Sequence, residues 1–208
     1  FVVGWDANPF PDWRVKTEVY YQYLSEVPIS RNINSFSMLN QGASFVMTEE
    51  SNLVNEGTGS NYGVEVTIEK FFSHGYYALL TGSLYEAKYR GSDDVERNTA
   101  FNGNYVYNIL AGKEFKIGKE KQNAITFDVK FSQAGGRYYT PIDLEASRAA
   151  GEQVLMGDEY AFSERYPGFL RLDIKGGFTL NSKKRKLSQT VFLDFQNECS
   201  TMRITEGA

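Results

Sequence analysis

Cysteine and histidine are almost absent from this sequence, with one of each among 208 residues. The single cysteine, Cys199, excludes a disulfide bond within the chain and a thiolate metal site. The single histidine, His74, stands between Ser73 and Gly75 in a predicted turn, so the chain has no set of histidines for a metal site and no arrangement typical of a catalytic triad. We therefore predict no catalytic residues, no metal site and no cofactor, and a protein that is not an enzyme.

Long apolar runs and an excess of positive charge are also missing. No run of about 18 apolar residues occurs, which excludes a membrane-spanning helix. With 22 basic and 26 acidic side chains the net charge is -4, so the chain lacks the basic surface that nucleic acid binding requires. The basic run 183–186 is interpreted as a solvated turn. A mean hydropathy of -0.42 remains compatible with a membrane β-barrel, whose strands carry apolar residues only at alternate positions.

Aromatic residues, by contrast, are abundant, since 14 Tyr, 15 Phe and 2 Trp make up 15% of the chain. Many of them lie in segments where apolar and polar residues alternate with a period of two, which is typical of β-strands. Between Trp13 and Tyr23, for example, the charged residues all fall on even positions. We predict eight strands, near residues 1–6, 13–24, 61–72, 76–90, 104–117, 123–135, 168–181 and 187–197. Residues 198–208 lack the alternation and are interpreted as an atypical tail.

The predicted connections alternate between short and long along the chain. Short turns are expected at 7–12, 73–75, 118–122 and 182–186, and long loops at 25–60, 91–103 and 136–167. This alternation places all turns at one end of an antiparallel up-and-down meander and all loops at the other. Outer-membrane barrels have the same asymmetry, and aromatic residues at both strand ends fit two membrane interfaces. The predicted fold class is all-β, a meander of about eight strands in a transmembrane outer-membrane β-barrel. A soluble antiparallel barrel or sandwich is the alternative.

Several stretches also resemble those of a particular family. They include Trp13–Leu24, Asn55–Gly59, Arg97–Asn102, Gly135–Asp143 and Leu193–Asn197. Taken in order over residues 1 to 197, the series resembles the C-terminal part of the barrel of TonB-dependent outer-membrane receptors, in the form common in Bacteroidetes. The resemblance implies a barrel of about 22 strands with a plugged lumen. This chain would then be a piece of a longer protein, without the plug domain.

The function implied by the resemblance is nutrient uptake. Such a receptor lies in the bacterial outer membrane, contacts outer-membrane lipid, works with its plug domain and with TonB, and imports a small-molecule or glycan ligand such as a metal chelate. A soluble or surface-attached β-rich binding module, which would bury the apolar face as a core, is the alternative from a different class. A small self-contained eight-stranded membrane barrel is a third possibility.

The long loop 136–167 carries the candidate ligand residues. These are Arg137, Tyr138 and Tyr139 near its start and Arg165 and Tyr166 near its end. Arginine and aromatic side chains on such a loop could clamp a ligand or stack on it. The alternative interpretation is that they form an aromatic belt and pair with neighbouring loops. The middle of the loop, 143–151, has local helix-forming character.

Pairs of acidic residues occur in all three long loops. They are Glu49-Glu50, Asp93-Asp94 and Asp158-Glu159. A calcium site is conceivable there, but none of the pairs has the spacing of an EF-hand loop. We interpret these carboxylates as solvated loop charge.

Overall fold

The computed structural model describes residues 1–43, 50–182 and 187–196. The strands are β1 (Val2–Ala7), β2 (Trp13–Ser30), β3 (Leu53–Ser73), β4 (Tyr76–Arg90), β5 (Glu96–Asn98), β6 (Tyr105–Ile117), β7 (Asn123–Ala134), β8 (Tyr138–Tyr139), β9 (Glu164–Arg165), β10 (Phe169–Asn181) and β11 (Ser188–Phe195). The helical elements are the 3-10 turns η1 (Met38–Asn40) and η2 (Asp158–Tyr160) and the helix α1 (Leu144–Ala150). Cys199, the acidic residue Glu49, the basic run 183–186 and the predicted tail 198–208 lie outside the described residues.

The main sheet is an antiparallel meander of eight strands. Its order is β1-β2-β3-β4-β6-β7-β10-β11, and the short strand β5 adds to β4 beside this path. Each long strand therefore pairs with the next long strand in the sequence, because the connections are hairpins. The predicted all-β meander is confirmed. The small strands β8 and β9 form a separate two-stranded sheet within the longest loop, and the sequence pattern does not predict them.

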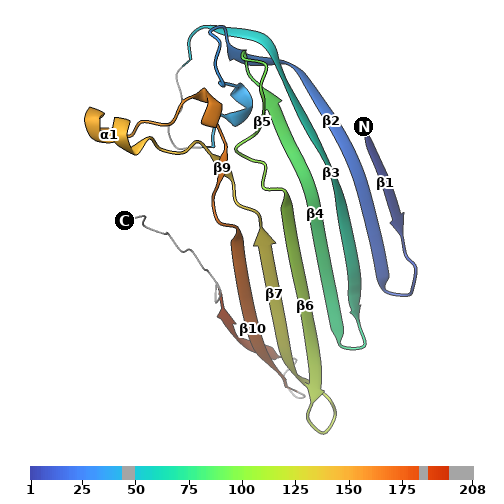
Figure 1. Cartoon of the computed structure of the whole chain (residues 1–208). Coiled ribbons are helices and arrows are strands. Elements are labelled where there is room, and N and C mark those ends of the chain that lie inside the picture. The colour runs from blue at the N-terminus through green and yellow to red at the C-terminus, as the bar shows by residue number, and fades with distance from the viewer. Residues whose placement is uncertain (44–49, 183–186, 197–208) are drawn as a thin grey trace.

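Figure 1 shows one curved sheet with the tight turns at one end and the long loops at the other, as predicted. The turn between β3 and β4 consists of His74 and Gly75, with φ angles of 52° and 78°. Positive φ at both central residues is the type I′ geometry, which matches the right-handed twist of paired strands. His74 is therefore a turn residue, as its sequence context predicts.

Alternation along each strand separates the sheet into two faces. Val19 pairs with Val64, Val64 with Leu84 and Leu84 with Tyr105, which gives a row of apolar side chains across four strands. We call this side the apolar face. The neighbouring positions belong to the other side, which we call the charged face. There the residue pairs are Asp6 with Lys16 and Arg14 with Glu69 in β1 to β3, and Lys130 with Asp173 and Asp128 with Lys175 in β7 and β10.

The hairpin of β2 and β3 is longer than the sequence pattern predicts. The alternation of β2 breaks at Glu26, whose φ is 58°, and the pairing with β3 shifts register on both sides of Val27. Pairing then continues from Pro28 to Ser30, so the predicted loop 25–60 is in part strand. A β-bulge of this kind moves later side chains to the opposite face and hides the strand from a search for alternation. Pro28 lies beyond the end of β1, at an irregular edge where its neighbour Ile29 makes an isolated bridge with Ser37, and a proline is tolerated in such a position.

Glycines stand opposite tyrosines in neighbouring strands at several points. Gly63 pairs with Tyr20 on one side, and a Cβ placed on Gly63 would lie 2.8 Å from the Tyr20 hydroxyl and 2.5 Å from the Leu84 carbonyl oxygen. Gly112 pairs with Tyr77, and its Cβ would lie 2.4 Å from that ring. Each tyrosine therefore lies over the backbone of the next strand, which requires glycine because any side chain would collide with the ring.

Few side chains in the middle of the sheet are buried. Large apolar residues in its middle remain about half exposed, including Val19 at 55% and Leu84 at 51%. In the described chain, no helix or second sheet packs broadly across either face. Most buried residues gather instead where the long loops leave the strands. This loop-end cluster comprises Val27, Ile29, Ser30, Ser37, Tyr89, Thr99, Ala100, Asn102 and Ala161. Among the described residues, none of the helices has the length and apolar character needed to cross a membrane.

Candidate functional site

Tyr89 is the central residue of the loop-end cluster. Its side chain is 1% exposed, and its hydroxyl donates a hydrogen bond of 3.0 Å to the carbonyl oxygen of Ser35. Its ring meets Phe162 edge-on, with 6.0 Å between the ring centroids. Tyr89 comes from the end of β4, Ser35 from the loop after β2 and Phe162 from the loop before β10. One buried ring therefore joins three parts of the chain that are far apart in the sequence.

Asn102 fixes the loop between β4 and β6. It is fully buried, and its amide nitrogen donates to Glu86 Oε2 and to Asn98 Oδ1, both at 2.9 Å. Its amide oxygen accepts from the backbone N–H of Ala87 at 3.1 Å. Buried polar groups are costly unless they are hydrogen-bonded, and here one side chain satisfies three partners. The loop is held as a defined structure by this network.

An ion pair ties the same loop together. Arg97 Nη2 lies 2.7 Å from Asp93 Oδ2, and the two side chains are 8% and 14% exposed. Partial burial disfavours the charged form of Asp93, but hydrogen bonds from Arg97 and from the Val95 N–H, together with the Arg97 charge, hold its pKa below the ordinary value. The hydrogen bond to Asp93 in turn raises the pKa of Arg97. The interpretation of Asp93 as solvated charge is wrong, whereas its neighbour Asp94 has an 88% exposed side chain.

Asp158 connects this loop to two others. Its carboxylate accepts a 3.0 Å hydrogen bond from the backbone N–H of Ser35, and its carbonyl oxygen accepts one of 2.9 Å from Arg97. The loops after β2, β4 and β7 therefore share a polar network. Asp158 is exposed, in keeping with its interpretation as solvated charge, and it is also hydrogen-bonded within the protein. The described chain holds no group of three or more His, Cys, Asp or Glu side chains placed to bind a metal ion.

The structure brings the predicted ligand residues together. Tyr138 pairs with Arg165 and Tyr139 with Glu164 in the sheet of β8 and β9. Tyr139 and Tyr166 stack with their ring centroids 4.2 Å apart and their planes 26° apart. The backbone N–H of Tyr166 donates to the carbonyl oxygen of Arg137 at 2.9 Å. The two ends of the long loop thus form one surface, although 24 or more residues separate them in the sequence.

Arg165 is used within the protein. Its Nε donates to the Gly136 carbonyl oxygen at 3.1 Å, and its Nη2 donates to the carbonyl oxygen of Gly103. The guanidinium carbon also lies 5.6 Å from the ring centroid of Tyr138 and 5.8 Å from that of Tyr105. Arg165 therefore holds the loop against the start of β6. This agrees with the alternative interpretation from the sequence, in which these residues pair with neighbouring loops.

Arg137, Tyr139 and Tyr166 remain the side chains best placed to meet a ligand. Arg137 is exposed, and its guanidinium carbon lies 5.4 Å from the ring centroid of Phe101. Tyr166 is 55% exposed beside the stacked ring of Tyr139. A stacked aromatic pair with a neighbouring cation suits planar, sugar-like or anionic groups. Phe101 was not predicted as a ligand residue from the sequence, although it lies within the stretch Arg97–Asn102 that is quoted above.

Between these two ends the loop forms a projecting arm. Helix α1 begins after Asp143, whose carboxylate accepts from the Ala146 N–H at 2.9 Å, and ends at Gly151, whose φ is 72°. The predicted helical character of 143–151 is confirmed, and N-cap and αL glycine explain both ends. In Figure 1 the arm extends away from the sheet, and Leu144 is 64% exposed.

Comparisons with protein families, with characterised proteins and with solved structures found no match to this chain.

Proposed function

We propose that the sheet is part of the wall of a bacterial outer-membrane β-barrel that belongs to a TonB-dependent receptor and imports a scarce small-molecule or glycan nutrient. Its apolar face would contact lipid, its charged face would line the lumen, and its loop end would meet the ligand. The observation that supports this most directly is the distribution of charge over the apolar face.

The apolar face carries no charged residue along its middle in the described part of the eight long strands. Charged residues occupy that face only at its ends. Lys70 and Lys113 lie toward the turns, and Glu86 and Lys88 lie toward the loops. An uncharged band with charges at both borders is what a bilayer requires, because a charge in the hydrocarbon region is costly. A protein in water has no need for that arrangement on an uncovered surface.

Lys70 shows how one border is built. Its side chain is only 4% exposed although it belongs to the apolar face, and its ammonium group turns toward the tight turn. There Nζ donates to the carbonyl oxygen of Phe71 at 2.8 Å and to the hydroxyl of Ser73, and it lies 4.8 Å from the ring centroid of Tyr76. The ammonium group is therefore enclosed by acceptors from the turn, so that Lys70 presents no free charge on the apolar face at this border.

The charged face is made of mutually paired polar groups. Arg14 lies 2.6 Å from Asp6, and Lys16 lies 2.6 Å from Glu18. The hydroxyl of Tyr77 donates to Asp128 at 2.8 Å. Such a surface suits the aqueous lumen of a barrel. A soluble module would instead have to cover the opposite, apolar face, and within the described residues nothing does so.

The packing of the loops against one another supports a ligand role for the loop end. The loop-end cluster holds three loops in one packed unit, and this unit presents Arg137, Tyr139 and Tyr166 on its surface. Preorganised side chains lose little conformational entropy when a ligand binds. In the full-length receptor, the plug domain and TonB would then act on the ligand collected at this end.

Cysteine accessibility tests the membrane placement. Single cysteines would be introduced in a Cys199→Ser background at Val66, Ile125 and Leu193 of the apolar face, and at the matched charged-face positions Glu65, Asp128 and Asp194. With the chain folded in lipid nanodiscs, we expect a water-soluble maleimide to label the apolar-face cysteines several-fold more slowly. Equal rates on the two faces would contradict the proposal. Labelling of the denatured chain, where all six positions should react alike, is the control.

A further inference from the structure

The short strands β8 and β9 form a ribbon whose two faces carry different side chains. Tyr138 pairs with Arg165 on the face that contacts the start of β6, where Arg165 donates to backbone carbonyl groups. Directly opposed residues of an antiparallel pair lie on the same face, and the faces alternate along each strand. The other face, which we call the outer face of the ribbon, therefore carries Arg137, Tyr139, Glu164 and Tyr166.

An aromatic platform lies along one diagonal of this outer face. Tyr139 and Tyr166 stack with their ring centroids 4.2 Å apart, and Tyr166 is 55% exposed. The face of an aromatic ring carries partial negative charge, so it attracts the C–H groups of a sugar ring. The exposed ring of Tyr166 therefore offers a flat surface for one ring of a ligand.

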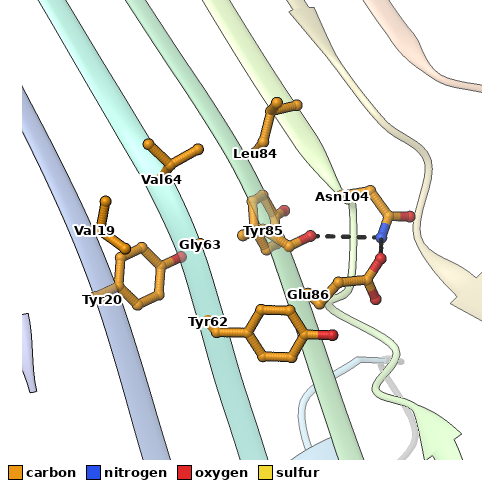
Figure 2. A pocket seen from close by; sticks show the side chains of 9 residues that line it. All are labelled: Val19, Tyr20, Tyr62, Gly63, Val64, Leu84, Tyr85, Glu86 and Asn104. Atoms are coloured by element: carbon orange, nitrogen blue, oxygen red, sulfur yellow. Dashed lines mark hydrogen bonds between the residues drawn. The ribbon is translucent and has the colours of Figure 1, made fainter.

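Two opposite charges occupy the other diagonal. Arg137 lies against the ring of Phe101, and both Arg137 and Glu164 are exposed. Among the described residues, neither of these two charges has an ion-pair partner. Figure 2 shows the opposite case near the loop end of β4, where the carboxylate of Glu86 accepts from the amide nitrogen of Asn104 at 2.8 Å. The two charges of the outer face are thus available to a ligand.

The combination favours a ligand whose ring carries both an anionic group and hydroxyl groups. Arginine binds a carboxylate through two parallel hydrogen bonds, whereas an ionised glutamate only accepts and suits hydroxyl donors. Residues two apart on a strand lie about 7 Å apart, so Arg137 and Glu164 flank a sugar ring stacked on Tyr166. A multiply charged anion such as ferric citrate would be attracted by Arg137 but repelled by Glu164.

We infer that the outer face of the ribbon binds an oligosaccharide that contains a uronic acid, with its carboxylate on Arg137, its ring on Tyr166 and its hydroxyl groups on Glu164. The inference rests on the proposed function, in which the loop end meets the nutrient, and it assigns that nutrient to the acidic glycans rather than to small anionic metal chelates. The ribbon is anchored for this task from behind, since Arg165 donates to Gly136 and the Tyr138 N–H donates to the Ala100 carbonyl oxygen at 3.2 Å.

A panel of immobilised oligosaccharides measures this selection. With the chain in lipid nanodiscs, the binding of oligosaccharides of glucuronate, galacturonate and mannuronate is compared with that of the neutral sugars in which a hydroxymethyl group replaces the carboxylate. We expect the best uronate to bind about fivefold more tightly than its neutral counterpart, as one exposed ion pair allows. Arg137→Gln should bring this ratio to one. The matched variant Arg148→Gln, which removes an exposed cation from helix α1 of the same loop, should leave it unchanged.

Two further variants test the other contacts. Tyr166→Ala should weaken the binding of uronate and neutral sugar together by several-fold, because both stack on the ring. Tyr160→Ala, which removes another exposed tyrosine of the loop, should weaken neither. Ferric citrate should bind the native chain more weakly than the uronate does. Glu164→Gln should narrow that difference, because it removes the repulsion of the chelate.

Equal binding of every uronate and its neutral counterpart by the native chain would overturn the inference, and so would tighter binding of ferric citrate. A loss of selectivity in Arg148→Gln as large as that in Arg137→Gln would also overturn it, since the effect would then come from overall charge. Failure of the proposed function is recognised separately, because the cysteines at Val66 and Leu193 would be labelled as fast as those of the charged face. Shielded cysteines combined with unselective sugar binding would refute the uronate site alone.

Discussion

The sheet and the loop-end cluster are built on opposite principles. In the sheet, hydrogen bonds between neighbouring strands hold a single layer whose two faces stay open, so that Leu193 is 66% exposed and Val191 is 69% exposed. In the cluster, Tyr89 and Asn102 are almost entirely enclosed by side chains and backbone from several loops. The sheet therefore depends on its surroundings to cover its apolar face, whereas the loop end supplies its own packing.

This difference separates two kinds of stability. Uncovered apolar side chains gain little from folding until lipid, or another apolar surface, replaces the water around them. The buried tyrosine and the hydrogen-bonded amides of the loop end stabilise their own positions in any solvent that preserves the fold. Variants in the two regions should therefore differ in how strongly they destabilise the protein and in which part of it they destabilise.

The largest effect is expected for Tyr89→Ala. This change removes a buried ring, its contact with Phe162 and its hydrogen bond to Ser35, and should lower the free energy of local opening at the loop end by about 4 kcal/mol. Hydrogen exchange of peptides from residues 31–43 and 96–104 measures that opening. Tyr23→Ala is the matched control, because Tyr23 is 60% exposed on the apolar face. Comparable loss of protection in both variants would remove the distinction between the regions.

An intermediate effect is expected for Gly63→Ala within the sheet. The new methyl group would lie 2.5 Å from the Leu84 carbonyl oxygen and 2.9 Å from the Tyr85 Cβ. Because the backbone of β4 cannot move aside freely, we expect a loss of about 2 kcal/mol in the free energy of unfolding. Gly176→Ala is the control, since a Cβ there has no atom within 4 Å. Thermal unfolding of both variants in the same lipid or detergent should show a lower midpoint for Gly63→Ala alone.

The smallest effect concerns the acid sensitivity of the loop between β4 and β6. The pKa of folded Asp93 is held below its ordinary value of 3.8, so its ionisation stabilises the loop above that pH. The contribution is lost as the pH falls below 3.8 and through the lower pKa of the folded state. The Val95 amide donates to Asp93 at 3.2 Å, so its protection from exchange, relative to the unfolded chain at the same pH, should decrease over this range. In Asp93→Asn the same amide should show no such step, and a step that persists would assign the effect to another group.

Much of the sheet was predictable from local patterns. The charges on alternate residues of 13–24 predicted the two faces of β2, and the context of His74 predicted the turn between β3 and β4. The extension of β2 beyond Leu24 was missed, because the bulge at Glu26 interrupts the alternation. Pairing across a bulge depends on which strand lies alongside, and a pattern within one strand does not contain that information.

The residues of the candidate ligand surface could be predicted from the sequence, but their arrangement in space could not. Arg137, Tyr139 and Tyr166 were selected because of their chemistry, and their clustering follows from the short pairing of β8 with β9. The structural use of Arg165 was left open by the sequence, because its hydrogen-bond acceptors are backbone carbonyl groups of Gly103 and Gly136. Backbone acceptors leave no mark in the side-chain pattern.

The sequence by itself determined the antiparallel meander, its two chemically distinct faces and the separation of turns from loops. These features follow from alternation and turn geometry, which involve residues close together along the chain. Only the tertiary structure decided that the loops form a packed cluster and that Asp93 and Asp158 are engaged within it. Those contacts join residues as far apart as Ser35 and Asp158, 123 positions along the chain, and such contacts exist only after the sheet has brought the loops to one end.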